Sequence, residues 1–322
     1  MKRAAVIILS LASFFAIIFI KPTSVQAEIQ NITVTPLVGD SDITDRFELI
    51  VKPGETREIK VSVSNFENNN VKIKLQPTNA TTSEDGKIAF TDMIKKGDFG
   101  LKYAFADMTK AKTIELGPQE TKDLAFKIKI PNEKFSGVII GGFNVFNVNK
   151  PNQAHSDVPV WLTESNESIG GILKIHSLGL QVIDSQPNII LNLSNTQPGM
   201  MKNLIVHGTI KRESWLDKIG LGDKEQETDQ KYPQVAPNSR IPLVFNQSQS
   251  PIKAGKYHVQ AEARSGKATW KFEYEYMISP KQAQEINDKS KDLVYDKTWT
   301  YVMLAGVLLV IVVFVFWLLF AN

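Results

Sequence analysis

The chain has 322 residues and a formal net charge of +3, with lysines and acidic residues interspersed. This near balance excludes the strongly basic surface typical of nucleic-acid-binding proteins, so no nucleic-acid partner is expected. The chain contains no cysteine, which excludes thiol chemistry, disulfides and cysteine-based zinc sites.

The N-terminus has the pattern of a secretory signal peptide over residues 1–27. Lys2 and Arg3 precede an apolar stretch, and a small-residue pattern predicts cleavage between Ala27 and Glu28. The alternative is an uncleaved anchor, because the apolar stretch is slightly longer than a usual signal core. In both cases the basic residues stay inside and the following chain is exported. Export without cysteine favours a cell surface where disulfides are unusual, as in many Gram-positive bacteria.

Residues 28–155 show the alternation of apolar and polar residues that predicts half-buried strands. The alternating segments are 57–65, 71–75 and 124–130, and a Gly-rich apolar strand follows at 135–146. Turn-forming residues 67–70 predict that the first two strands form a hairpin. Glycines inside the Gly-rich strand indicate a bend, a bulge or a close backbone approach. About seven short strands in this length predict an immunoglobulin-like sandwich.

Residues 156–280 predict a second immunoglobulin-like sandwich, after a polar loop that places the domain boundary between residues 155 and 156. Its most regular strand is 270–278, in which aromatic residues alternate with charged ones. This aromatic ladder is made of Trp270, Phe272, Tyr274 and Tyr276. Alternation with charge favours a core face for the ladder, and the other interpretation is a sugar-stacking platform.

A charged segment, Arg212 to Tyr232, interrupts the second sandwich and is long for a hairpin loop. Its length makes it a candidate contact for a protein partner. The alternative interpretation is a mobile insertion without a binding role.

The C-terminal region predicts a polar juxtamembrane stalk at 281–298 and one transmembrane helix at 299–320. The helix runs from Trp299 to Phe320, and it is long enough at about 1.5 Å per residue to cross a hydrocarbon core of about 30 Å. Only Ala321 and Asn322 follow it, without the basic residues usual after a stop-transfer helix. The predicted fold is therefore all-β, with two tandem sandwiches, a stalk and a membrane anchor.

The order of these features resembles the WxL-interacting protein family of Gram-positive cell surfaces. The resemblance covers nearly the whole chain and is carried by a set of short motifs, none of them specific alone. They are Ile32 to Pro36, Leu49 to Asn65, Asn79 to Thr82 before Asp85-Gly86, Phe135 to Gly142, Val235 to Ser239, Ala254 to Tyr257, and the Trp270 strand. The resemblance implies a peptidoglycan-binding first domain, a host-binding second domain and partnership with secreted WxL-domain proteins.

Patterns for catalysis and metal binding are weak. Ser250 and Lys253 match the Ser-x-x-Lys spacing of penicillin-interacting enzymes, but they precede a strand and no Lys-Thr-Gly accompanies them. The acidic cluster of Asp40, Asp42 and Asp45 lacks the glycine and terminal glutamate of an EF-hand loop. Four histidines, His155, His176, His207 and His258, have no paired ligand spacing. No catalytic residue, cofactor site or metal site is therefore predicted.

Two functions remain as hypotheses. The first is a membrane-anchored, non-enzymatic adaptor or adhesin at the cell surface, which binds peptidoglycan, WxL-domain proteins and host extracellular proteins. The second is a cell-wall-modifying hydrolase with dispersed carboxylates, because paired acids for glycoside cleavage need not be close in sequence.

Overall fold

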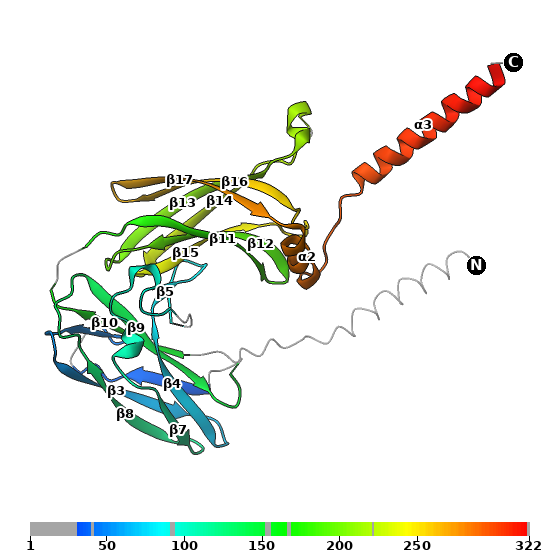
Figure 1. Cartoon of the computed structure of the whole chain (residues 1–322). Coiled ribbons are helices and arrows are strands. Elements are labelled where there is room, and N and C mark those ends of the chain that lie inside the picture. The colour runs from blue at the N-terminus through cyan, green and yellow to red at the C-terminus, as the bar shows by residue number, and fades with distance from the viewer. Residues whose placement is uncertain are drawn as a thin grey trace, which may run out of the picture.

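The computed structural model describes residues 31–39, 42–90, 94–151, 156–165, 169–220 and 222–320, shown in Figure 1. The predicted cleavage site at Ala27 and Glu28 lies outside these residues. The strands of the first half are β1 (Ile32–Pro36), β2 (Phe47–Ile50), β3 (Thr56–Asn65), β4 (Val71–Asn79), β5 (Thr81–Thr82), β6 (Ile88–Ala89), β7 (Lys112–Leu116), β8 (Thr121–Lys129), β9 (Val138–Asn147) and β10 (Ser156–Thr163). Those of the second half are β11 (Leu173–Ile183), β12 (Gln186–Asn195), β13 (Met201–Arg212), β14 (Gln226–Val235), β15 (Ser239–Asn246), β16 (Gly255–Ser265) and β17 (Ala268–Ile278). The helices are η1 (Asp98–Gly100), η2 (Phe105–Asp107), η3 (Trp215–Ile219), α2 (Pro280–Lys289) and α3 (Thr298–Phe320).

The first sandwich is built from β1 to β4 and β7 to β10, and β5 pairs with β6 in a separate two-stranded sheet. A three-stranded sheet, β1-β3-β8, packs on a five-stranded sheet, β2-β10-β9-β4-β7. The predicted alternation explains the packing, because β3 buries Ile59, Val61 and Val63 and leaves Lys60 exposed between them. The same rule holds in β4, where Ile73 is fully buried. The expected immunoglobulin-like arrangement is confirmed.

The second sandwich contains β11 to β17. A three-stranded sheet, β11-β12-β15, faces a four-stranded sheet, β14-β13-β16-β17, and all pairs are antiparallel. The aromatic ladder of β17 alternates along the strand as predicted. Its four rings are half-buried and pack against the core of this sandwich, as expected for a core face.

The predicted hairpin between the segments at 57–65 and 71–75 is wrong. The two segments form β3 and β4, which belong to opposite sheets, so the chain crosses from one layer to the other at residues 66–70. Asn65 fixes this crossing: its side-chain amide donates to the carbonyls of Asn69 (2.9 Å) and Gly117 (2.7 Å). Turn composition therefore identified the reversal of the chain but not the strand partner.

The domain boundary in the structure differs from the predicted one between residues 155 and 156, because strand β10 belongs to the first sandwich. This strand pairs antiparallel with β9 and parallel with β2, inside the first sandwich. The reason is burial, because Val158, Val160 and Leu162 are fully buried in the first core. The structural boundary therefore lies between Thr163 and Leu173, after the polar loop that the sequence had suggested.

Helix α2 packs on the second sandwich, whereas the sequence predicted a polar juxtamembrane stalk, or a polar helix leading to the membrane, for this segment. Ala283 is 5% exposed and Ile286 packs against the second core. The Asn287 side chain forms two hydrogen bonds of 2.9 Å, donating to the Ile252 carbonyl and accepting from the Ile252 backbone N–H. Two apolar positions three residues apart and the hydrogen bonds of Asn287 together hold an otherwise polar helix.

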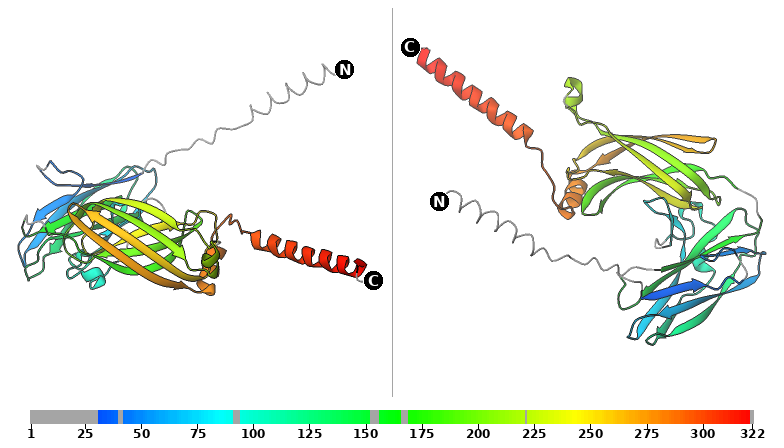
Figure 2. Two further views of the ribbon diagram at one scale, coloured as in Figure 1. Left: turned by 90° about the horizontal axis from the view of Figure 1, so that it is seen from above. Right: turned by 180° about the vertical axis from the view of Figure 1, so that it is seen from behind.

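Helix α3 extends away from both sandwiches, as Figure 2 shows from two further directions. It contains one segment, Thr300–Trp317, long and apolar enough to cross a membrane, with mean hydropathy 2.6 and no buried residues. Its 23 residues span about 34 Å. The helix is a candidate membrane anchor, and its predicted membrane ends at Trp299 and Phe320 remain a prediction.

The Tyr232 hydroxyl makes a testable contribution to the second core. Tyr232 is fully buried and donates a hydrogen bond of 2.6 Å to the Pro242 carbonyl, and burial raises the pKa of its hydroxyl. We expect Tyr232→Phe to lower the free energy of unfolding by about 1–2 kcal/mol, because the Pro242 carbonyl loses its side-chain donor. Urea denaturation measures the change. Tyr274→Phe is the control, since no hydrogen bond involves the Tyr274 hydroxyl within the described residues; an equal loss in both variants would contradict this assignment.

Candidate functional site

The two sandwiches meet along a seam of buried hydrogen bonds. The Ala236 backbone N–H donates to Thr82 Oγ1 (3.0 Å), and Ser239 Oγ donates to the Ala236 carbonyl (2.8 Å). Because the one proton of Ser239 is used in this way, the Thr82 hydroxyl donates across the 2.9 Å contact to Ser239 Oγ. Thr82 is 1% exposed and Ser239 is fully buried. The seam is thus a satisfied polar network inside the molecule.

Close backbone packing completes the seam. An apolar cluster of Ala80, Phe90, Ile140 and Ala236 lies between the sandwiches. Next to it, Gly137 has a φ of +79°, and its missing Cβ would lie 2.2 Å from the Pro198 carbonyl oxygen. The neighbouring Val138 N–H donates to that oxygen at 2.9 Å. Only glycine permits this approach.

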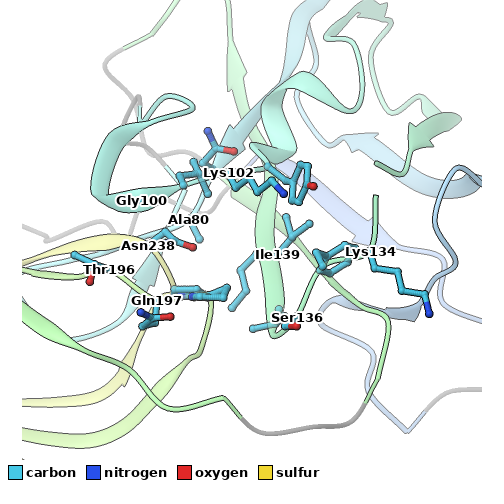
Figure 3. A pocket seen from close by; sticks show the side chains of 17 residues that line it. Ala80, Gly100, Lys102, Lys134, Ser136, Ile139, Thr196, Gln197 and Asn238 are labelled. Atoms are coloured by element: carbon cyan, nitrogen blue, oxygen red, sulfur yellow. The ribbon is translucent and has the colours of Figure 1, made fainter. Parts of the chain in front are cut away.

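A cavity of about 340 Å³ opens beside the seam, with walls from both sandwiches (Figure 3). The first sandwich contributes the end of β4, the segment between η1 and η2, and the β8–β9 loop. The second contributes two turns, β12–β13 and β14–β15. The polar lining residues include Asn79, Lys102, Tyr103, Lys134, Ser136, Thr196, Gln197 and Asn238.

The two lysines of the cavity differ in their partners. Lys102 Nζ lies 2.9 Å from a Glu133 carboxylate oxygen, which also accepts a hydrogen bond of 2.8 Å from the Tyr103 hydroxyl. Hydrogen bonding to Tyr103 and to Glu133 raises the pKa of Lys102. The same contacts, led by Lys102, lower the pKa of Glu133. Lys134 is exposed and makes no ion pair within the described residues, so its positive charge is available to a ligand.

Aromatic and amide groups also line the cavity, and the Lys134 side chain points outward at its rim (Figure 3). The rings of Tyr103 and Phe135 lie 6.2 Å apart at 58°, and the Asn238 amide donates to the Phe99 carbonyl (3.1 Å), which fixes its position. A cation, two rings and fixed amides suit a ligand that carries a carboxylate and an apolar or sugar face. Among the residues that the structure describes, no Asp or Glu lines this cavity, so the described walls supply no paired carboxylates for hydrolysis.

The other residues considered from sequence do not assemble into a site. Lys253 pairs with Asp223 (2.9 Å) instead of approaching Ser250, whose backbone forms a turn with Gln247. His207 contacts Asp229 (3.0 Å), and His258 contacts Glu213 and Glu275. Asp45 pairs with Arg46, while Asp40 and His155 lie outside the described residues. Among the described residues, no group of three or more His, Cys, Asp or Glu could hold a metal ion.

Comparison with known families resolves the identity of both halves. Residues 32–147 match the family described as WxL Interacting Protein, peptidoglycan binding domain. Residues 147–288 match WxL Interacting Protein, host binding domain. The chain belongs to the WxL-interacting protein family. For a WxL-interacting protein, these domains indicate peptidoglycan binding and host binding, and a cell-surface location.

Other comparisons add little about this WxL-interacting protein. No curated protein sequence matches it. Among solved structures, the CupB2 chaperone of Pseudomonas aeruginosa is 12% identical over 69% of this chain and 93% of its own, with a TM-score of 0.27. The PapD-like domain 7 of human CEP192 is 12% identical over 43% of this chain and 87% of its own, with a TM-score of 0.26. No property of those proteins is transferred to this chain.

The family motifs acquire a structural meaning at the seam. The stretch Asn79 to Thr82 touches Val235 to Ser239, although more than 150 residues separate the hydrogen-bonded pair Thr82 and Ser239. The Gly-rich motif supplies Gly137 against Pro198, and a Cβ on Gly86 would lie 2.7 Å from the Lys231 carbonyl oxygen. Sequence reasoning treated these motifs as turns and strand residues within single domains. It had no signal that they join the two sandwiches of this WxL-interacting protein.

Proposed function

We propose that this chain is a membrane-anchored adaptor of the cell surface. Its first sandwich binds peptidoglycan, its second binds WxL-domain surface proteins and host extracellular proteins, and α3 holds both at the membrane. The family match over residues 32–288 is the observation that carries the proposal. The cavity beside the seam adds a place where the wall polymer would be recognised.

The chemistry of the cavity supports peptidoglycan as its ligand. The stem peptides of this polymer carry carboxylates, which suit the available Lys134 ammonium, and its amino sugars present faces that pack on aromatic rings such as Tyr103 and Phe135. Lys102 is already paired with Glu133, which also accepts a hydrogen bond from Tyr103. We therefore assign the ligand's carboxylate to the other lysine of the cavity, Lys134. Both matched domains are binding domains, which favours an adaptor over a hydrolase.

Sedimentation with purified peptidoglycan tests this assignment, using the full chain in detergent micelles. We expect Lys134→Ala to weaken binding about tenfold or more, because one charge-assisted contact is lost. Lys127→Ala, an exposed lysine on β8 outside the cavity lining, is the matched control and should leave binding unchanged. Equal weakening by both variants would show that the chain binds peptidoglycan through nonspecific charge attraction and not through Lys134. Release of soluble wall fragments would favour the hydrolase instead.

A further inference from the structure

The end of the second sandwich nearest to α3 is fixed by two backbone hydrogen bonds. After α2, the Lys291 N–H donates to the Ser185 carbonyl and the Val294 N–H donates to the Gln249 carbonyl, both at 2.8 Å. Only residues 295–297 separate Val294 from Thr298, the first residue of α3. At about 3.5 Å per residue, α3 therefore begins within about 14 Å of the Val294 contact.

The β13–β14 connection leaves the sandwich from this same end. We call residues 213–220 and 222–225 the tip. At its base, Arg212 Nη1 donates to the Ala254 carbonyl (3.3 Å), and Lys253 pairs with Asp223 of the tip (2.9 Å). Ala254 and Lys253 lie in the β15–β16 loop, which also contains Gln249. Figure 1 shows the tip projecting from the side of the second sandwich from which α3 departs.

Local caps give the tip a defined shape. Within η3, Ser214 Oγ accepts from the Leu216 N–H (3.3 Å), and Asp217 Oδ2 accepts from the Ser214 N–H (2.7 Å), which is a capping box. Gly220 ends the helix with a φ of +74°. The Ser214 N–H and Lys211 hold the pKa of Asp217 below its usual value.

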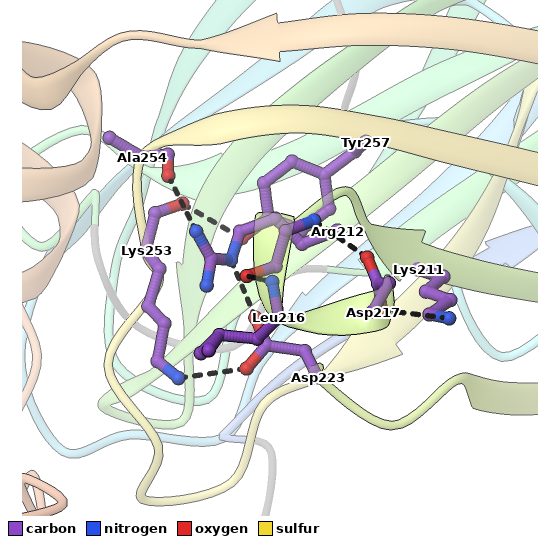
Figure 4. Close-up of polar contacts among 9 residues, drawn as sticks. Lys211, Arg212, Leu216, Asp217, Asp223, Lys253, Ala254 and Tyr257 are labelled. Atoms are coloured by element: carbon purple, nitrogen blue, oxygen red, sulfur yellow. Dashed lines mark hydrogen bonds and ion pairs between the residues drawn. The ribbon is translucent and has the colours of Figure 1, made fainter. Parts of the chain in front are cut away.

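Ion pairs brace the tip against the sandwich, as Figure 4 shows. Asp223 accepts from Arg212 Nε at 2.5 Å and also from Lys253. Asp217 pairs with Lys211 at 3.0 Å. Of the four acids of the tip, Asp217, Asp223 and Glu213 are thus paired, the last with His258 and Lys256, and Glu225 stays exposed. These contacts tie the base of the tip to the sandwich, which favours a braced projection over the mobile insertion considered from sequence.

The tip presents apolar groups to solvent, together with two lysines and the acids Glu213 and Glu225. Trp215 is 71% exposed and Ile219 is 60% exposed. Lys218 and Lys224 are exposed and make no ion pair within the described residues. Tryptophan, an aliphatic residue and lysines together are the residues that favour the headgroup layer of a membrane, where an aromatic ring has both apolar and polar surroundings.

We propose that the tip inserts Trp215 and Ile219 into the headgroup layer of the bilayer that α3 spans. The proposal rests on the membrane anchoring proposed above. The short connection to α3 favours lipid over a protein as the occupant, because it keeps the tip close to the membrane at a high effective concentration. The sequence made the longer segment 212–232 a candidate contact for a protein partner, but residues 226–232 belong to β14, an edge strand of the second sandwich.

The absence of cysteine allows a site-specific test in the full chain. Ile219→Cys, labelled with an environment-sensitive fluorophore, is reconstituted into vesicles of phosphatidylcholine and phosphatidylglycerol that contain spin-labelled quenching lipids. Leu304→Cys in α3 reports anchoring, and Lys267→Cys in the β16–β17 turn, at the opposite end of the second sandwich, is the aqueous control. We expect the labels at 219 and 304 to be quenched, at headgroup and hydrocarbon depth respectively, and the label at 267 to remain unquenched.

A second substitution measures the role of Trp215. In the Ile219→Cys background, Trp215→Ala should lower the membrane-inserted to free ratio of the tip about tenfold, since a large apolar side chain leaves the lipid. The substitution leaves the core untouched because this side chain is mostly exposed. A quenched label at 304 with an unquenched label at 219 would overturn the proposal and leave the anchor intact. An unquenched label at 304 would remove the anchor and the proposal together. Protection of the label at 219 only when a surface protein is added would assign the tip to a protein partner.

Discussion

Replacing Gly137 with alanine should open the seam between the two sandwiches. The new Cβ would lie 2.2 Å from the Pro198 carbonyl oxygen and 2.8 Å from its carbon. Both obstacles are backbone, so a rotamer change cannot relieve the clash. The Val138 to Pro198 hydrogen bond would be lost with it. We expect a loss of about 2–4 kcal/mol from overpacking and from the left-handed φ, together with weaker binding in the adjacent cavity.

Calorimetry and small-angle scattering measure this effect. Gly266→Ala is the matched control, because Gly266 also has a positive φ (+58°) but its Cβ would meet nothing within 4 Å. The control carries the conformational cost without the clash. If the two variants unfold alike and keep the same dimensions in solution, the seam is not closed by this contact.

The Asn195→Ala substitution should destabilise the second sandwich by about 3–5 kcal/mol. The side chain is fully buried and its amide donates to the carbonyls of Gly199 (2.8 Å) and Ala236 (3.2 Å). Its oxygen accepts from the backbone N–H groups of Ile172 (3.3 Å) and Gln197 (3.2 Å). Alanine would leave four backbone groups without these partners, beside the turn that lines the cavity.

Asn192 on the same strand provides the comparison. It is 9% exposed, and its amide donates to Ser177 Oγ at 3.2 Å, while its oxygen accepts no hydrogen bond from the residues that the structure describes. Asn192→Ala should therefore cost about 1 kcal/mol or less. Chemical denaturation measures the free energy of unfolding of both variants. Similar midpoints would contradict the larger stabilisation that we assign to the hydrogen bonds of Asn195.

Asn65 makes the corresponding hydrogen bonds in the first sandwich. Like Asn195, it ends a strand, donates to the carbonyl four residues ahead, and accepts from the N–H two residues ahead (Glu67, 2.9 Å). Each also donates to the lead-in of a later strand, at Gly117 or Ala236. The two sandwiches thus repeat one device for turning the chain between layers.

Sequence patterns predicted the strands well because burial of alternate residues is a local property. Ile59, Val61 and Val63 face the core as their spacing required. Strand partners were harder, since pairing joins distant segments: nothing within residues 57–75 indicates that β3 and β4 lie in different sheets, or that β10 joins the first sandwich.

The candidate site was not predicted, for a related reason. Thr82 and Ser239 have the composition of surface turns, and only their mutual burial shows that they form an interface. Lys134 belongs to a polar loop with no motif of its own. The cavity depends on how two folded units meet, which no single stretch of sequence encodes.

Strand β12 runs along the second sandwich from the linker to α3 toward the cavity. It begins beside Ser185, where the linker to α3 is held, and ends at Asn195, beside the turn that lines the cavity. Its 10 residues span about 33 Å. Under the proposed anchoring, the second sandwich would separate the cavity from the linker to α3 by about the length of this strand. Which part of the cell wall the cavity can bind would then depend on its distance from the membrane as well as on the chemistry of its walls.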